Sequence, residues 1–212
     1  MALSDRTAAR AGVGPAFGSA PAIFLDKDGT LIDDVPYNVN PDLVTLTVGA
    51  GRALAQLARQ GYRLVVVSNQ PGIGDGRFEA AALSAVEHRI RELLAAWRVS
   101  IDAFYYCPHT PSLGCECRKP APGLLMCAAA EHKLDLRRSW LIGDILDDIE
   151  AGRRAGCRTA LLMNGNETEW ALAPLRLPHV FVRTLPRAAE CIVAAQRARV
   201  KFRETYRVRA VV

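Results

Sequence analysis

The stretch AIFLDKDGTL, residues 22–31, carries the strongest fold signal in this chain. Its first four residues are all apolar, which predicts a strand buried on both faces of a sheet. Asp26 and Asp28 follow directly and precede the turn-forming Gly29. Two carboxylates at the end of a buried strand suit chemistry on phosphate, because one can attack phosphorus while the other transfers protons. The alternative is an ordinary surface turn, since Asp-Gly is common in turns.

Further apolar runs alternate with helical patterns along the rest of the chain. Strands are predicted at 64–67, 103–106, 140–142, 159–163 and 180–182. Helices are predicted at 51–60, 79–97, 122–132 and 148–155 and near the C-terminus, with a glycine-rich loop at 71–77. Such alternation predicts an α/β fold in which right-handed crossovers build a mostly parallel sheet covered by helices on both faces.

Polar residues follow several of these predicted strands. Ser68 and Asn69 come after the second strand and Asp144 after the fourth, with Asp148 one helical turn later. The carboxyl ends of parallel strands share one edge of a sheet, so these side chains and Asp26 are expected to meet in one crevice. Ordinary alternatives exist, because Ser68 can cap a helix and Asp144 can form a turn.

The residue types in this crevice favour phosphate and a hard cation. Asp26 and Asp144 could share Mg²⁺, with the backbone carbonyl of Asp28 completing the set and Asp148 supporting it. The hydroxyl of Ser68 and the amide of Asn69 could hold phosphoryl oxygens. The ammonium of Lys119 could then offset their charge, although a solvated loop lysine is the alternative.

A second cluster combines three cysteines with one histidine. Cys107, His109, Cys115 and Cys117 fall within eleven residues. Three thiolates and one imidazole can complete a tetrahedral zinc site, which leaves no open position for catalysis and would therefore be structural. The alternative is a set of reduced surface thiols beside an incidental histidine.

Composition restricts the remaining possibilities. The chain has 212 residues, half of them hydrophobic, and a net charge of +5. It lacks the apolar run of roughly 18 residues that a bilayer span needs, and we expect a cytoplasmic monomer without membrane contact. We expect a flexible extension over 1–20, a catalytic domain over 21–185 with a zinc loop at 107–117, and a basic helix or tail over 186–212. That tail could contact nucleic acid, but no aromatic platform accompanies it, and a solvated helix face is expected instead.

Four segments together resemble the motifs of the haloacid dehalogenase-like hydrolases: FLDKDGTL, VVVSNQ, CRKP and LIGDILDD. The resemblance covers residues 23–157 and implies a Rossmann-like three-layer sandwich. It implies that Asp26 is the nucleophile and that Asp28 acts first as general acid and then as general base. It also implies that Ser68 and Lys119 bind phosphate, and that Asp26, Asp28 and Asp144 bind Mg²⁺.

The cysteine-rich loop is similar to that of a capless subgroup, which contains heptose 1,7-bisphosphate 7-phosphatases and histidinol phosphatases. This resemblance implies a phosphorylated small-molecule substrate, with the 7-phosphate of a heptose bisphosphate as the first expectation and histidinol phosphate as the alternative. It places Asp34, Tyr37 and Gln70 in the substrate pocket and assigns Arg118 to sugar recognition. More distant alternatives are a nucleic-acid 3′-phosphatase and a non-catalytic zinc-stabilised binding module.

Overall fold

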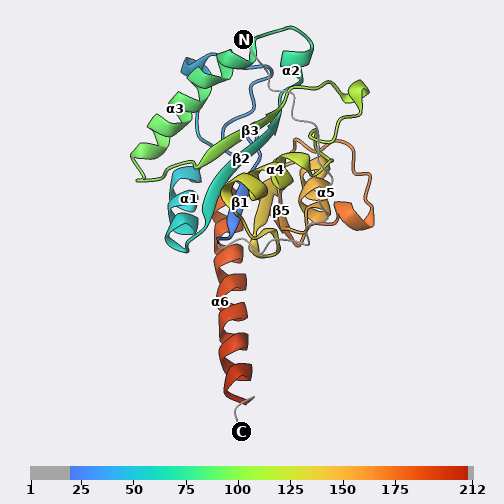
Figure 1. Cartoon of the computed structure of the whole chain (residues 1–212). Coiled ribbons are helices and arrows are strands. Elements are labelled where there is room, and N and C mark those ends of the chain that lie inside the picture. The colour runs from blue at the N-terminus through green and yellow to red at the C-terminus, as the bar shows by residue number, and fades with distance from the viewer. Residues whose placement is uncertain (1–19, 210–212) are drawn as a thin grey trace.

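A single sheet organises the molecule, whose computed structural model describes residues 20–209, with side chains up to residue 199. The strand order is β3-β2-β1-β4-β5-β6, and every pairing is parallel (Figure 1). The strands are β1 (Ala22–Leu25), β2 (Arg63–Asn69), β3 (Ala103–Cys107), β4 (Trp140–Gly143), β5 (Arg158–Leu162) and β6 (Val180–Val182). This is the strand order of the Rossmann fold, so the predicted α/β architecture is confirmed.

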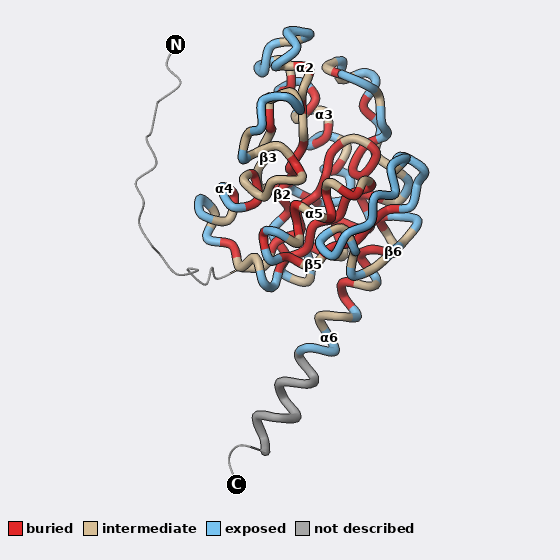
Figure 2. The backbone as a smooth tube through the Cα atoms, turned by 90° about the vertical axis from the view of Figure 1, so that its right-hand side faces the viewer, coloured by how far each residue is buried: buried red, intermediate tan, exposed pale blue. Residues whose placement is uncertain are grey.

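Helices cover both faces of this sheet and complete a three-layer sandwich. The side chains of α1 (Ala50–Arg59), α3 (Leu83–Ala95) and α6 (Leu185–Arg209) pack in one apolar cluster against one face. Those of α4 (Gly123–His132) and α5 (Leu146–Arg154) pack against the other face. All four residues of β1 are fully buried, and the buried strands occupy the centre of the molecule (Figure 2). An apolar run therefore predicted a central strand correctly.

Three local boundaries differ from the sequence-based expectation. Residues 71–77 are not entirely loop, because Pro71–Gly74 form the short helix α2, in which proline at the first position presets the backbone. The helix predicted over 79–97 begins as a 3-10 turn at Ala80–Ala82 and continues as α3. Helix α5 begins at Leu146 rather than at Asp148, since the Asp148 carboxylate accepts a hydrogen bond from the Ile145 N–H (3.3 Å) and so caps the first turn.

The register brings the polar strand ends together. Leu25 lies between Val66 of β2 and Ile142 of β4. The Asp26 N–H continues the ladder by donating to the Ile142 carbonyl (3.0 Å). From β1 at the centre of the sheet, the chain builds β2 and β3 outward on one side and returns to β4 on the other side. Asp26 and Asp144 therefore lie at the point where the strand order reverses, which is where open α/β sheets bind ligands.

The termini lie partly outside the described residues. Of the expected extension over 1–20, only Ala20 is described, and it forms a bridge with Leu134. The C-terminal helix is present as α6, which leaves the body at the end opposite α2 (Figure 1). Within residues 20–209, no helix is both long and apolar enough to cross a membrane. The domain boundaries at 20 and 185 stay predictions.

Candidate active site and zinc loop

Asp26 lies beside a buried lysine at the carboxyl end of β1. The Lys119 ammonium is 2.5 Å from Asp26 Oδ1 and 2.6 Å from Asp148 Oδ1, and it donates to the Val67 carbonyl at 3.0 Å. Burial lowers the pKa of Lys119, but the carboxylates of Asp148 and Asp26 outweigh this effect and hold its pKa above the usual value. The lysine therefore stays charged, and Asp148 keeps it pointing at Asp26.

Asp144 is held by amide and hydroxyl groups that were not among the predicted site residues. Its Oδ2 accepts hydrogen bonds from Asn166 (2.6 Å) and Asn164 (3.5 Å), and its Oδ1 accepts one from Thr30 (3.3 Å). Gly29 has a positive φ of 75°, and a Cβ there would lie 2.2 Å from Asp144 Oδ2. Asn164 and Asn166 follow β5 at the same edge of the sheet, so the strand-end rule that selected Asp144 could also have found them.

These carboxylates form a donor set that fits a divalent cation. Oxygens of Asp26, Asp144 and Asp148 lie within 4.8 Å of one another, and all three residues are buried. Burial raises the pKa of Asp144 to about 6, with a further contribution from the charge of Asp148. Burial also raises the pKa of Asp26, which Lys119 opposes and the neighbouring carboxylates reinforce. A hard cation would offset this accumulated negative charge and keep Asp26 ionised.

Asp28 faces a different set of partners. Its Oδ1 pairs with the buried Lys27 ammonium at 2.5 Å, and its Oδ2 accepts a hydrogen bond from the Gln70 amide at 3.0 Å. The same Gln70 nitrogen donates to Ser68 Oγ at 2.9 Å. Gln70 thus links the predicted acid–base carboxylate to the predicted phosphate-binding hydroxyl, and the structure brings these three predicted residues together.

Two other predicted site residues make contacts with the backbone. The Asn69 amide donates to the Lys119 carbonyl at 3.1 Å and accepts from the Lys119 N–H at 3.0 Å. The Arg118 guanidinium donates to the His109 carbonyl at 3.2 Å. Asn69 therefore holds the Lys119 backbone in place, and Arg118 stabilises the neighbouring loop through its bond to His109. The phosphate contact of Asn69 and the sugar contact of Arg118 stay predictions.

Tyr37 belongs to an aromatic cluster on the α2 side of the site. The Arg77 guanidinium stacks 4.1 Å from the centre of the Tyr37 ring. Gly72 permits this packing, because a Cβ there would lie 2.4 Å from the Phe78 ring and 2.8 Å from the Tyr37 ring. The two predicted pocket residues diverge, since Tyr37 packs against α2 whereas Asp34 borders a cavity next to Asp144.

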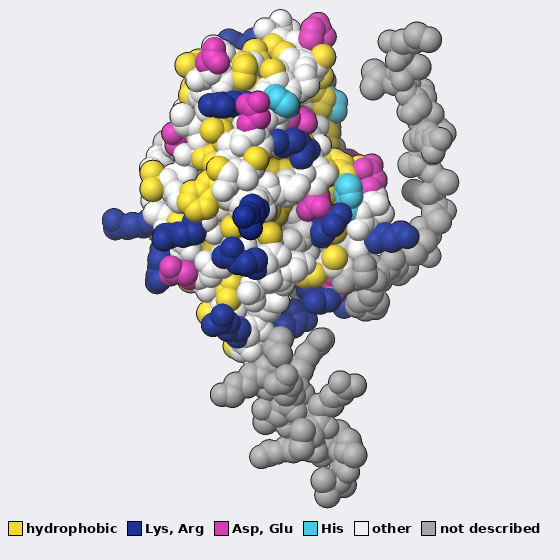
Figure 3. Space-filling view, turned by 90° about the vertical axis from the view of Figure 1, so that its left-hand side faces the viewer, with side chains coloured by type: hydrophobic (Ala, Val, Ile, Leu, Met, Phe, Trp, Pro, Cys, Tyr) yellow, Lys and Arg dark blue, Asp and Glu magenta, His cyan; other side chains and the backbone are white. Residues whose placement is uncertain are grey.

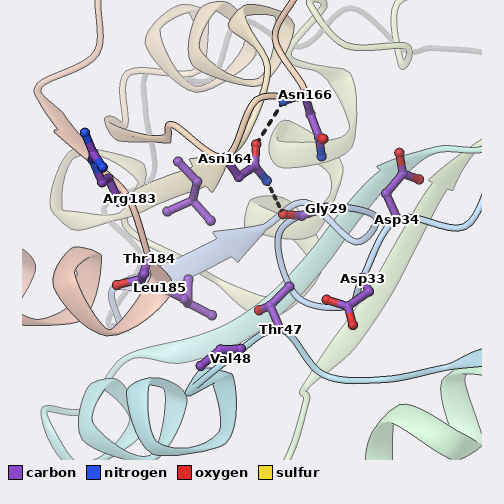
Figure 4. Close-up of a pocket in the computed structure, with 11 residues that line it drawn as sticks. Gly29, Asp33, Asp34, Thr47, Val48, Asn164, Asn166, Arg183, Thr184 and Leu185 are labelled. Atoms are coloured by element: carbon purple, nitrogen blue, oxygen red, sulfur yellow. Dashed lines mark hydrogen bonds between the residues drawn. The ribbon is translucent and has the colours of Figure 1, made fainter.

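That cavity has a volume of about 370 Å³ and is bordered in part by Gly29, Asp34, Thr47, Asn164, Asn166 and Arg183. In Figure 4, Arg183 and Asp34 lie on opposite sides of the cavity, and Asn164 lies between them with hydrogen bonds to Gly29 and Asn166. Burial and the charge of Asp28 raise the pKa of Asp34. The cavity therefore presents a cation, a carboxylate and amides to any ligand that extends from Asp144.

The four residues predicted to bind zinc converge. The Cys107 sulfur is 3.6 Å from Cys115 Sγ and 3.2 Å from Cys117 Sγ, and His109 Nδ1 is 3.2 Å from Cys117 Sγ. A tetrahedral site with Zn–S bonds near 2.3 Å has edges of about 3.8 Å, so this cluster is close to the size zinc requires. Burial raises the pKa of the Cys115 thiol, but the Arg118 N–H and the Cys117 sulfur outweigh it and lower that pKa to about 6.

The sheet has the Rossmann strand order, and paired aspartates follow β1. A lysine and further aspartates lie where the strand order reverses. This combination defines a hydrolase of the haloacid dehalogenase (HAD) class. A family model described as HAD-hydrolase-like matches residues 116–188. The chain is 34% identical over 158 residues to D-glycero-β-D-manno-heptose-1,7-bisphosphate 7-phosphatase of Pseudomonas aeruginosa, covering 74% of this chain and 89% of that one. It is 35% identical over 173 residues to the same enzyme of Escherichia coli K12, covering 74% and 91%.

A solved structure is similar over most of its length. D,D-heptose 1,7-bisphosphate phosphatase of Bordetella bronchiseptica, complexed with magnesium and phosphate, superposes with a TM-score of 0.73 and 32% identity. The match covers 82% of this chain and 99% of that one. The chain thus belongs to the HAD-like hydrolases, within the family of the heptose bisphosphate phosphatases. It is a phosphatase, as the resemblance of its motifs implied.

Proposed function

We propose that this protein is a Mg²⁺-dependent phosphatase that removes the 7-phosphate of D-glycero-β-D-manno-heptose 1,7-bisphosphate through an aspartyl-phosphate on Asp26. The observation that carries the mechanism is the convergence of Asp26, Asp28, Asp144 and Asp148 with the Lys119 ammonium at one strand edge. The substrate is supported by the names of relatives that are 34–35% identical to this chain.

The reaction has two displacements at phosphorus. In the first, an Asp26 carboxylate oxygen bonds to phosphorus as the bond to the sugar oxygen breaks, and Asp28 donates a proton to that leaving oxygen. In the second, Asp28 takes a proton from water, whose oxygen attacks phosphorus and releases phosphate. The Asp26 carboxylate is thereby regenerated.

The surrounding residues orient these groups. Lys27 and Gln70 hold the two oxygens of Asp28, and Lys119 stabilises charge on the phosphoryl oxygens together with Ser68. Asp26, Asp144 and the Asp28 carbonyl would hold Mg²⁺, and Asp148 supports the site by fixing Lys119. When bound, Mg²⁺ neutralises charge on the phosphoryl oxygens and on the attacking carboxylate.

Asp26→Asn tests the mechanism. We expect kcat to fall about 10³-fold or more, because the amide cannot form the phosphoenzyme, while the circular dichroism spectrum stays unchanged. Covalent phosphate on Asp26 should be trapped by rapid acid quench of the unaltered protein. Undiminished turnover by Asp26→Asn would exclude the mechanism.

The substrate is tested separately by comparing kcat/KM for heptose 1,7-bisphosphate and histidinol phosphate with the same purified protein. We expect a clear preference for the bisphosphate, since 34–35% identical relatives carry that name. A preference for histidinol phosphate would overturn the substrate and leave the mechanism intact.

A further inference from the structure

A small, strongly basic cavity lies at the opposite end of the sheet from the catalytic aspartates. Its volume is about 90 Å³, the space of roughly three waters at about 30 Å³ each. Its lining includes Tyr62, Arg138, Trp140, Arg158, Gln196 and Arg199, and we call this cavity the arginine pocket. Figure 3 shows Lys and Arg side chains gathered near the point where the C-terminal helix leaves the body.

Three of the arginines that border the arginine pocket have no acidic partner among the described residues. Its lining contains no Asp or Glu, and within residues 20–199 the guanidinium groups of Arg138, Arg158 and Arg199 form no ion pair. The Arg158 guanidinium lies 5.6 Å from the centre of the Trp140 ring, within the range of a cation–π contact. Like charges held close together repel, and an anion between them would remove that cost.

Tyr62 borders the same cavity as these arginines. Burial raises the pKa of its phenol, whereas a hydrogen bond with Trp140 and then the charges of Arg138, Arg158 and Arg199 act in the opposite direction. Guanidinium groups match the planar, two-oxygen edge of a phosphate, so three of them around one cavity favour a phosphate group over a monovalent ion.

Gln196 indicates what else the ligand carries. Its amide nitrogen donates to the Gln60 carbonyl at 3.3 Å, whereas its Oε1 is buried with no donor among the described residues. A buried acceptor without a donor costs free energy. A hydroxyl on the ligand would supply that donor, either the alcohol of a phosphate ester or the P–OH group of hydrogen phosphate.

The arginine pocket is separate from the catalytic site. Pro21, Trp140 and Arg158 stand before or at the first residues of β1, β4 and β5, whereas Asp26, Asp144 and Asn164 follow the last residues of the same strands. Four or five residues of strand at about 3.3 Å each put roughly 13–17 Å between the two ends. One ligand phosphate cannot occupy both.

We propose that the arginine pocket is a second ligand site, which binds the phosphate group of a small anion that also offers a hydroxyl donor. The site is distinct from the phosphatase site and does not depend on which ester is hydrolysed there. Its recognition elements are the guanidinium groups of Arg158 and Arg199 and the acceptor of Gln196.

The Trp140 indole N–H provides a readout specific to this pocket. The chain has three tryptophans, so Trp140→Phe assigns the resonance in a ¹H–¹⁵N spectrum. Full-length Asp26→Asn, which prevents turnover, is titrated with mannose 6-phosphate and with inorganic phosphate at constant ionic strength. We expect a saturable shift of this resonance with both probes, and the ratio of the two midpoints shows whether the sugar adds to recognition.

Substitutions in the same background test the recognition elements. Arg158→Gln and Arg199→Gln should each weaken binding about 10-fold or more, as expected for a charge-assisted hydrogen bond. Arg52→Gln, an exposed arginine on α1, removes the same charge and should change nothing. In the unaltered background, Arg158→Gln should leave kcat/KM within about twofold.

Three results would overturn the proposal. One is the absence of a saturable shift with either probe, and another is binding that neither Arg158→Gln nor Arg199→Gln weakens. The third is a single-stranded oligonucleotide that shifts the Trp140 resonance at lower concentration than mannose 6-phosphate. That result would make the pocket part of a polyanion-binding surface on α6.

Discussion

Lys119 is a buried cation whose position depends on side chains from three parts of the chain. Asp26 and Asp148 hold its ammonium, and Asn69 holds both polar groups of its backbone. At the residue scale, we therefore expect catalysis to depend also on groups that need not touch substrate. Gly143 belongs to this arrangement, since a Cβ there would lie 2.3 Å from the Asp148 carboxyl group.

Asn69→Ala tests the alignment of Lys119. The variant leaves the Lys119 N–H and carbonyl without their partner, so we expect about 1–3 kcal/mol less unfolding free energy in urea and a lower kcat. Asn40→Ala, which removes an amide that accepts from the Asp42 N–H, controls for the loss of an asparagine elsewhere. Equal effects of the two substitutions on kcat would contradict an aligning role.

Asn166→Ala tests the support of Asp144. Groups that orient a metal ligand typically contribute 10–100-fold in affinity, so we expect the Mg²⁺ concentration for half-maximal activity to rise by about that factor. Thermal unfolding without Mg²⁺ should change little, because Asn166 is otherwise a loop residue after β5. A large loss of stability with unaltered Mg²⁺ dependence would instead assign Asn166 a purely structural role.

At the scale of elements, the zinc loop connects β3 to α4 through close backbone contacts. The Gly123 N–H at the start of α4 donates to the Glu116 carbonyl at 3.0 Å, and a Cβ on Gly123 would lie 2.3 Å from that oxygen. The Gly74 N–H of α2 donates to the Pro108 carbonyl at 2.9 Å. The loop therefore also positions the segment that ends in Lys119.

Cys115→Ser tests this structural role. We expect loss of bound zinc, measured as metal content per chain, together with a lower melting temperature and a lower kcat, because Lys119 follows Cys117 by two residues. Cys127→Ser is the matched control, since Cys127 is an exposed thiol on α4. A protein that retained zinc and full activity after Cys115→Ser would exclude the four-ligand site.

At the scale of the whole molecule, the candidate catalytic residues lie at the carboxyl ends of the strands, the catalytic edge of the sheet. The arginine pocket lies at the amino ends of the same strands, the basic edge. Helix α6 joins the basic edge to the core, since Leu185, Ala188, Ala189 and Ile192 pack in the same cluster as β1 and α1. Its first half is therefore an integral part of the fold, and the excess of Lys and Arg begins only after it, at Arg197.

Ile192→Ala tests that integration. The residue is fully buried, so we expect about 2–5 kcal/mol less unfolding free energy in urea, against about 0.5–1.5 kcal/mol for the control Ile192→Val. Both variants should keep the KM of the unaltered protein, because Ile192 lies away from the catalytic edge. A cost near zero for Ile192→Ala would mean that α6 docks only loosely.

The sequence alone was enough to predict the parallel sheet, the strand ends that carry Asp26, Ser68 and Asp144, and the convergence of the Cys₃His cluster. These features depend on local patterns, namely apolar runs, turn residues and ligand spacing. They can therefore be identified before the three-dimensional fold is known. The contacts of Asn69, Asn164 and Asn166, the clamp of Asp148 on Lys119 and the arginine pocket were decided by tertiary structure. Their partners are distant in sequence, and only the strand register and helix packing bring such residues within hydrogen-bond or charge distance.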